Sequence, residues 1–246
     1  MSLSIRVSDT ARHQENYFKA NKGKSQTKLA INSNLGTEVD VGRLIASTEG
    51  MDVEIYTSME AVGVQAEYIR DGLNYNDWSA NVLKLLDAGR TVHFMATINA
   101  LCLESLCAHL NQLLEWKRTY GRERVNFTLN ILRFPSFQSP LVLPDSLRKH
   151  YGDTLERWLE HNTESHRRHL LHEHEINHTQ RMIDYLDVVK TPHREAFELP
   201  KLRSDFRHFY QQYDQRRSKS FQRAFEGLRA FGIHGGTQLI DWYNTL

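Results

Sequence analysis

Four short segments in which apolar and polar side chains alternate constrain the fold of this chain more than any other feature. The clearest is 91–99, where TVHFMATIN places an apolar side chain at every second position and ends at Asn99. This period of two is typical of a β-strand with two different faces. The same alternation predicts strands at 28–33, 52–58 and 124–132.

Segments with helical periodicity separate these strands. One covers 38–49 and stops at Gly50, and a short piece covers 65–71. A third helix has Asn76 as its expected N-cap and Gly89 as its expected C-cap, and a fourth ends at Gly121. Strands that alternate with helices over short links indicate βαβ units and a parallel sheet.

The polar strand faces restrict this sheet further. Parallel strands that are covered by helices on both faces are almost continuously apolar. The four predicted strands are apolar on one face only. A parallel sheet that is covered on one side only is a barrel or a part of one. The sequence therefore predicts an α/β fold, a partial parallel (β/α) barrel of four βα units (a TIM-like half barrel), followed by a helical C-terminal region.

Three regions follow from this pattern. Residues 1–26 form a polar N-terminal remnant with a helical patch around 11–20, and residues 27–144 form the partial barrel. Residues 145–246 form a helical region that caps the sheet or holds a partner. Its expected helices are 145–150, 153–189, 203–213 and 219–231.

The composition excludes several classes of protein. A net charge of +1 over 246 residues gives no strong nucleic-acid signal. Two cysteines exclude a disulfide framework and fit a reducing compartment. No apolar run reaches transmembrane length, and the N-terminus has no signal peptide. We expect a cytoplasmic protein without membrane contact.

The polar strand faces are the first candidate site. Neighbouring strands would point one set of side chains into a common space: Asn32, Asn34, Glu54, Tyr56, Ser58, His93, Met95, Thr97, Asn99, Asn126, Thr128 and Asn130. We favour a binding site for a polar small molecule, because sites in such folds lie at the carboxyl ends of the strands. Those ends offer Asn34, Ser58, Asn99 and Arg133. The alternative is a hydrogen-bond network that only sets strand register.

Two smaller features belong to the same region. Arg70 follows the second strand closely enough to meet a carboxylate above Ser58, with a surface salt bridge as an equal alternative. Cys102 and Cys107 are best explained as buried small hydrophobic residues, because their spacing is not that of a redox pair.

The segment 174–178 matches H-E-x-x-H. On a helix, His174 and His178 would share one face and could bind zinc, with Glu175 as general base. Asp184 or Glu195 could supply a third ligand. Other histidines in the same stretch make a chance match easy, among them His161, His166, His169 and His172. A solvated helix with many titratable side chains is therefore the preferred interpretation.

Several runs of this sequence resemble one family. LAINSNLG, VEIYTSMEAVGVQAEYIRDGLNYNDW, TVHFMATINALCLESL and VNFTLNILRFPSFQSPLVLP resemble the middle and later strands of radical S-adenosylmethionine enzymes, in particular the twitch-domain-containing subgroup. FYQQYDQRRSKSFQRAF near the end resembles the C-terminal helix of that subgroup. The resemblance covers residues 27–144 and part of the tail.

The resemblance implies a partial (β/α)6 barrel in which these four strands are the third to sixth. S-adenosylmethionine would lie across their carboxyl ends. Ser58 would match the ribose-contacting position, Arg70 a position near the methionyl carboxylate, and Asn34 and Asn99 polar residues at strand ends. The chemistry would be reductive cleavage of the cofactor to a 5′-deoxyadenosyl radical that takes hydrogen from a substrate, which is a peptide or a metabolite.

The sequence departs from the family in its first two βα units. The C-x-x-x-C-x-x-C motif that holds the 4Fe–4S cluster is absent, as is the G-G-E motif. We expect a fragment that is inactive alone, with the missing N-terminal half of the barrel as its partner, rather than a relative that has lost catalysis. The missing units would leave a strand edge open at 28–33. A zinc-dependent hydrolase and a non-catalytic protein-binding module remain as alternatives.

Overall fold

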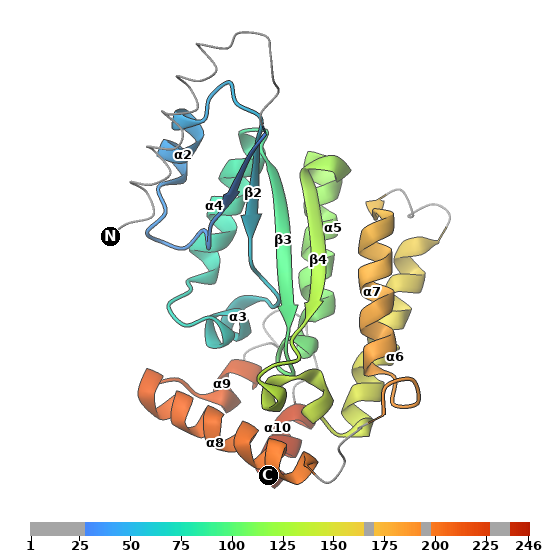
Figure 1. Cartoon of the computed structure of the whole chain (residues 1–246). Helices are drawn as coiled ribbons and strands as arrows, with labels where there is room; N and C mark the ends of the chain where they lie inside the picture. The colour runs from blue at the N-terminus through green and yellow to red at the C-terminus, as the bar shows by residue number, and fades with distance from the viewer. Residues whose placement is uncertain (1–27, 165–169, 193–197, 227–236) are drawn as a thin grey trace.

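The computed structural model describes residues 28–164, 170–192, 198–226 and 237–246. Its centre is a parallel sheet in the order β1-β2-β3-β4 (Figure 1). The four strands agree with the expected segments to within one residue at each end: β1 (Leu29–Asn32), β2 (Val53–Thr57), β3 (Thr91–Ile98) and β4 (Val125–Ile131). The predicted α/β class and parallel sheet are confirmed.

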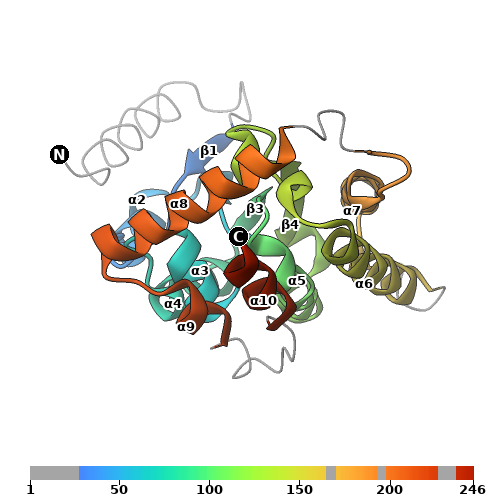
Figure 2. The same cartoon turned by 90° about the horizontal axis from the view of Figure 1, so that it is seen from below.

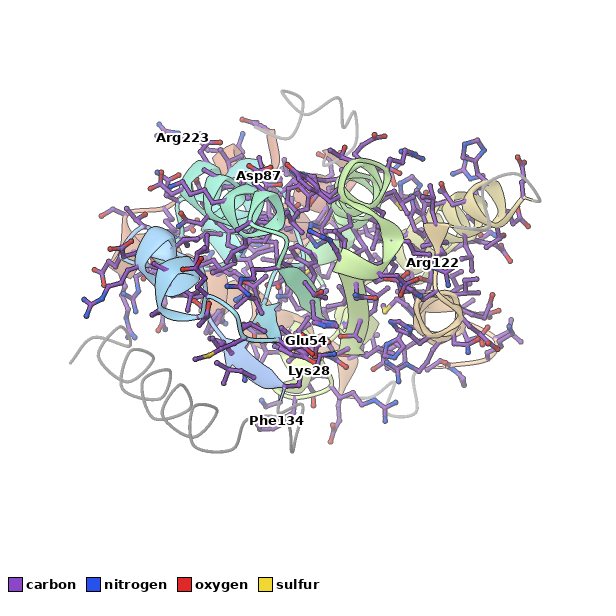
Figure 3. The ribbon with its side chains drawn as sticks, turned by 90° about the horizontal axis from the view of Figure 1, so that it is seen from above. Lys28, Glu54, Asp87, Arg122, Phe134 and Arg223 are labelled. Carbon is purple, nitrogen blue, oxygen red and sulfur yellow. The ribbon has the colours of Figure 1, made fainter. Side chains whose placement is uncertain are left out.

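The helices that connect the strands lie on one side of the sheet (Figures 1 and 3). They are α2 (Val41–Ser47), α4 (Tyr75–Asp87) and α5 (Leu106–Tyr120), with the short α3 (Gly63–Ile69) before α4. Crossovers between parallel strands are right-handed, so a sheet whose strands follow their sequence order receives every crossover helix on the same face. That face carries the buried core, including Phe94, Phe127 and Trp78.

The expected N-cap of α4 is wrong by two positions. Asn74, not Asn76, is the N-cap, and its side-chain oxygen accepts hydrogen bonds from the backbone N–H of Asn76 (3.0 Å) and Asp77 (3.1 Å). The helix begins earlier because Tyr75 is buried and stacks on Trp78 with 5.6 Å between ring centroids. Gly89 lies just beyond the C-cap and has φ +75°, a conformation in which glycine is favoured.

The C-terminal region is helical, with boundaries that differ from those expected. Its helices are α6 (Asp145–Thr163), α7 (Glu173–Leu186), α8 (Leu199–Arg217), α9 (Phe221–Glu226) and α10 (Thr237–Thr245). The helix α6 continues through Gly152, where a Cβ atom would lie 3.6 Å from Leu186 Cβ. The small residue therefore permits close packing of α6 against α7 and does not end the helix. A single helix over 153–189 is also wrong, because α7 begins anew at Glu173.

These helices cover two borders of the sheet. The helix α7 runs beside the outer edge of β4, and α8, α9 and α10 lie below the carboxyl ends of the strands (Figures 1 and 2). Aromatic side chains join the lower helices, with Phe221 and Tyr243 stacked at 4.0 Å between centroids. The sequence predicts that this region caps the sheet or holds a partner, and its described helices lie along these two borders. Within the described ranges, no helix is both long and apolar enough to cross a bilayer.

The predicted N-terminal remnant 1–26, His166, His169 and Glu195 lie outside the described residues.

Candidate functional site

The face of the sheet away from α2, α4 and α5 carries the predicted polar side chains, and we call it the polar face. Side chains of neighbouring strands form rows across this face. His93 lies between Tyr56 and Asn126, Met95 lies beside Thr128, and Thr97 lies beside Asn130. These side chains are half-buried or exposed, whereas their neighbours along β2 and β3, and most of those along β4, are buried. Most of the polar groups therefore keep access to solvent, which limits the cost of burying them. His93 Nε2 is buried without a hydrogen-bond partner among the described residues.

A compact cluster around Glu54 occupies the amino-terminal half of the polar face. Tyr56 donates its hydroxyl hydrogen bond to Glu54 Oε2 (3.1 Å), and Lys28 Nζ lies 2.5 Å from Oε1. His93 Nε2 lies 3.3 Å from Oε1 without the alignment of a hydrogen bond, and its ring stacks on Tyr56 at 4.5 Å between centroids. Partial burial raises the pKa of Glu54, but the hydrogen bond from Lys28 and the charge of His93 outweigh it and leave that pKa below its ordinary value. The carboxylate therefore stays ionised at neutral pH.

The carboxyl-terminal half of the polar face has fewer internal contacts. Within the described part of the chain, no side-chain hydrogen bond joins Thr97, Thr128 or Asn130 to a neighbour on the sheet. Thr97 and Asn130 are exposed. A network that only fixed strand register would bond these groups to one another, so their freedom favours an outward role such as ligand binding.

Two of the four predicted cofactor residues also have local structural roles. Asn34 is exposed and accepts a hydrogen bond from the backbone N–H of Gly36 (3.2 Å). Asn99 accepts from the backbone N–H of Leu101 (2.8 Å) and Cys102 (3.1 Å), and so shapes the turn that leaves β3. Ser58 is half-buried at the end of β2, with no hydrogen bond to its hydroxyl among the described residues.

Arg70 has a partner that the sequence reasoning missed. Its Nε lies 3.2 Å and its terminal nitrogen 2.5 Å from Glu60 Oε2. Glu60 is 4% exposed, and burial raises its pKa even though Arg70 opposes the shift. The sequence could have indicated this pair, because Glu60 lies between the apolar residues Met59 and Ala61. A carboxylate buried among apolar residues needs a cationic partner. An external carboxylate would have to share Arg70 with Glu60.

The cysteines behave as buried apolar residues. Cys102 is fully buried, and burial raises the pKa of its thiol well above the ordinary value. Burial likewise raises the pKa of Cys107 to about 12. Both therefore stay protonated near neutral pH, whereas iron–sulfur clusters are held by thiolates. With only two cysteines in the chain, these residues do not fit the 4Fe–4S cluster that the resemblance implies.

The glutamate of the H-E-x-x-H segment is buried in an ion pair. Both Glu175 oxygens accept from Lys117 Nζ (2.8 and 2.7 Å), and both side chains are fully buried. The carboxylate also accepts from the backbone N–H of Phe127 (3.0 Å) and His172 (2.8 Å). Burial lowers the pKa of Lys117, and the charge of Glu175 counteracts that shift. A carboxylate with four donors has no free lone pair for a water, which favours a structural role over that of general base.

The two histidines of the same segment lie next to each other, with 6.4 Å between ring centroids, but have different further partners. His178 Nδ1 lies 3.2 Å from Leu129 N and 3.1 Å from Leu129 O, at the edge of β4. His174 is exposed, and Asp184 pairs with Lys190 at 2.6 Å. In the described part of the chain, no group of three or more His, Cys, Asp or Glu side chains is arranged to hold a metal ion.

Comparisons with known proteins do not identify a family for this chain. No protein-family model matches the chain, and no curated protein or solved structure matches it significantly.

Proposed function

We propose that this chain is the partial barrel of a radical S-adenosylmethionine enzyme, in which the polar face and the carboxyl ends of the strands bind the cofactor and position a substrate. One observation carries the proposal. The parallel sheet has its strands in sequence order, its connecting helices on one face, and on the other a polar face that α2, α4 and α5 leave uncovered. Such a sheet is compatible with a section of a (β/α) barrel, and ligands in barrels bind at the carboxyl ends of the strands.

The residues at those ends fit S-adenosylmethionine in part. The Ser58 hydroxyl is available for a ribose, and the exposed Thr97 and Asn130 offer further polar atoms. Asn34 and Asn99 each keep a side-chain N–H₂ group for a ligand, because only the oxygen of each amide is used locally. Arg70 would hold the methionyl carboxylate while it also pairs with Glu60. Radical hydrogen abstraction would require a reduced cluster supplied from outside these residues, and this chain would contribute cofactor binding and substrate positioning.

A binding experiment tests this proposal without requiring turnover. The isotopically labelled chain is titrated with S-adenosylmethionine, and backbone amide shifts are followed by NMR. We expect weak, saturable binding, with shifts concentrated at residues 57–60 and 97–101. The S58A variant should bind about fivefold more weakly, because one neutral hydrogen bond contributes about 1 kcal/mol. The control K84A changes an exposed residue of α4 on the opposite side and should bind as the parent does.

Two results would contradict the proposal. One is the absence of any saturable shift. The other is a set of shifts confined to the C-terminal helices, with S58A indistinguishable from the parent chain.

The alternative of a protein-binding module has less support. The exposed large apolar side chains in the described part of 145–231 are Val189 and Phe209. They lie on different elements, and Phe209 also packs on Phe137 at 5.3 Å between centroids. Scattered single apolar residues are normal on protein surfaces and do not mark an interface.

A further inference from the structure

The Glu54 cluster is a preformed site for a single positive charge. Tyr56 holds Oε2 with a hydrogen bond, and the stacked His93 ring stands beside Oε1. Tyr56 and His93 belong to the two inner strands, β2 and β3, and face each other as register partners. The pairing of these strands therefore fixes their positions. The carboxylate is therefore held in place from two sides without any contribution from Lys28.

The third partner of Glu54 differs from these two. Lys28 precedes β1 at the border of the sheet, and its side chain is 52% exposed. A lysine side chain has four rotatable bonds, so the Lys28 ammonium can turn into solvent. The Glu54 side chain is 17% exposed, so its carboxylate then needs another cation in place of Lys28. Figure 3 shows Lys28 and Glu54 next to each other on the side of the sheet away from α4 and α5.

We propose that Glu54, Tyr56 and His93 form a binding site for the primary alkylammonium group of the substrate, and that Lys28 occupies this site in the free protein. The inference rests on the proposed function only in using the same face for the substrate. The geometry selects the ligand class. Tyr56 uses one lone-pair site of Oε2, and the Lys28 ammonium already lies 2.5 Å from Oε1, so the arrangement accommodates the compact point charge of an ammonium at Oε1. A guanidinium favours two oxygens, and Ca²⁺ or Mg²⁺ requires six or more ligands.

The position of the site also restricts the length of the substrate. Glu54 and Ser58 are four residues apart on β2, which corresponds to about 13 Å along the strand. A substrate held by its ammonium at Glu54 and reacting near the cofactor must extend over much of that distance. A long diamine or a lysine residue within a peptide meets this requirement, whereas a short amine does not.

The test measures amine binding by NMR at the Glu54, Tyr56 and His93 signals of the full chain. Pentylamine is the probe, and pentanol is its uncharged counterpart. We expect pentylamine to bind and pentanol to give no shift. E54Q should abolish the pentylamine shift, and the control E49Q, at an exposed position outside the sheet, should not. Cadaverine and N-acetyl-lysine amide then distinguish a diamine substrate from a lysine residue.

The pentylamine affinity of the K28M variant shows whether Lys28 competes with amines for the site. Removing an internal competitor increases the fraction of free sites, so K28M should bind pentylamine severalfold more tightly than the parent chain. If Glu54 only stabilises the sheet through Lys28, K28M leaves amine binding unchanged or absent, and that result would overturn the inference. E54Q should keep the S-adenosylmethionine shifts at 57–60 and 97–101. Failure of amine binding is thereby distinguished from failure of the proposed function.

Discussion

At the scale of single residues, buried polar groups show most clearly what a structure adds to a sequence. His109 is fully buried on α5, and its ring lies 6.4 Å from that of Phe94 between centroids. Neither ring nitrogen has an aligned hydrogen bond, although the backbone of Met59 lies close enough to favour the charged ring. Burial dominates and lowers the pKa of His109 from 6.5 to about 3.

This burial predicts a pH dependence of stability. Between its folded and unfolded pKa values, His109 binds a proton only in the unfolded chain. The free energy of unfolding should therefore fall as the pH drops below about 6.5, by up to about 1.4 kcal/mol per pH unit from this group. The H109L variant should lose that part of the slope in urea unfolding measured between about pH 7 and about pH 5. H208L, at an exposed position on α8, serves as control, and an unchanged slope in H109L would refute the assignment.

At the scale of elements, the strands could be predicted from the sequence. The helix that contacts the edge of β4 could not. The strands β3 and β4 pack one face against α4 and α5, and this burial accounts for the apolar side chains at every second position, such as Val92 and Phe94. The role of Glu175 depends on Lys117, Phe127 and His172, the first two of which are about 50 positions earlier in the chain. A local motif contains no information about such distant partners. It therefore suggests zinc chemistry where the fold has an ion pair.

The helix α7 completes the edge of β4 with side chains in place of a fifth strand. Glu175 accepts from the Phe127 N–H, and Arg181 donates to the Leu129 carbonyl (2.6 Å). An uncovered strand edge is a template for association with other chains, and helices commonly cover it. The sheet has two edge strands, β1 and β4. Described residues of α7 cover the edge of β4.

The Lys117–Glu175 pair should be essential for this arrangement. In K117M the buried Glu175 charge loses its partner, and we expect a loss of about 3–5 kcal/mol in the free energy of unfolding. The Phe127 amide should also exchange faster with solvent, because α7 no longer holds its acceptor in place. Urea unfolding and hydrogen exchange measure the two effects.

A matched control is K149M, which breaks the exposed Lys149–Asp153 pair and should cost less than about 1 kcal/mol. Similar losses in K117M and K149M would show that the buried pair has no special role.

At the scale of the whole molecule, the C-terminal helices are tied to the loop region after β2. Asp214 of α8 accepts from the Tyr68 hydroxyl (2.8 Å) and from the Phe221 N–H (2.9 Å). Tyr213 donates to the Tyr68 carbonyl (2.8 Å), and Lys219 donates to the Glu67 carbonyl (2.6 Å). Burial and the Asp214 charge raise the pKa of Tyr68, so its hydroxyl remains a donor. The segment that precedes Arg70 is thereby fixed to α8 and α9.

The sequence indicated this region as helical but not how it docks. Polar residues such as Asp214 and Lys219 fit a solvated helix equally well, and only their partners on α3 reveal a contact. The region after β2 and the C-terminal helices α8 and α9, here called the cap, therefore depend on each other. A change in the cap should alter the carboxyl ends of the strands.

The D214A variant tests this dependence. It removes a charged acceptor from two donors, and a hydrogen bond to a charged group contributes about 1.5–3 kcal/mol. We expect a loss of about 2–3 kcal/mol in the free energy of unfolding. Trp242 packs on Phe206 of α8 at 5.3 Å between centroids, so tryptophan fluorescence should report the loosened cap. The control D205A breaks the exposed Lys201–Asp205 pair of the same helix and should leave both readouts near those of the parent chain. If D214A also weakens S-adenosylmethionine binding while D205A does not, the cap positions the cofactor residues. Equal binding in both variants would limit its role to stability.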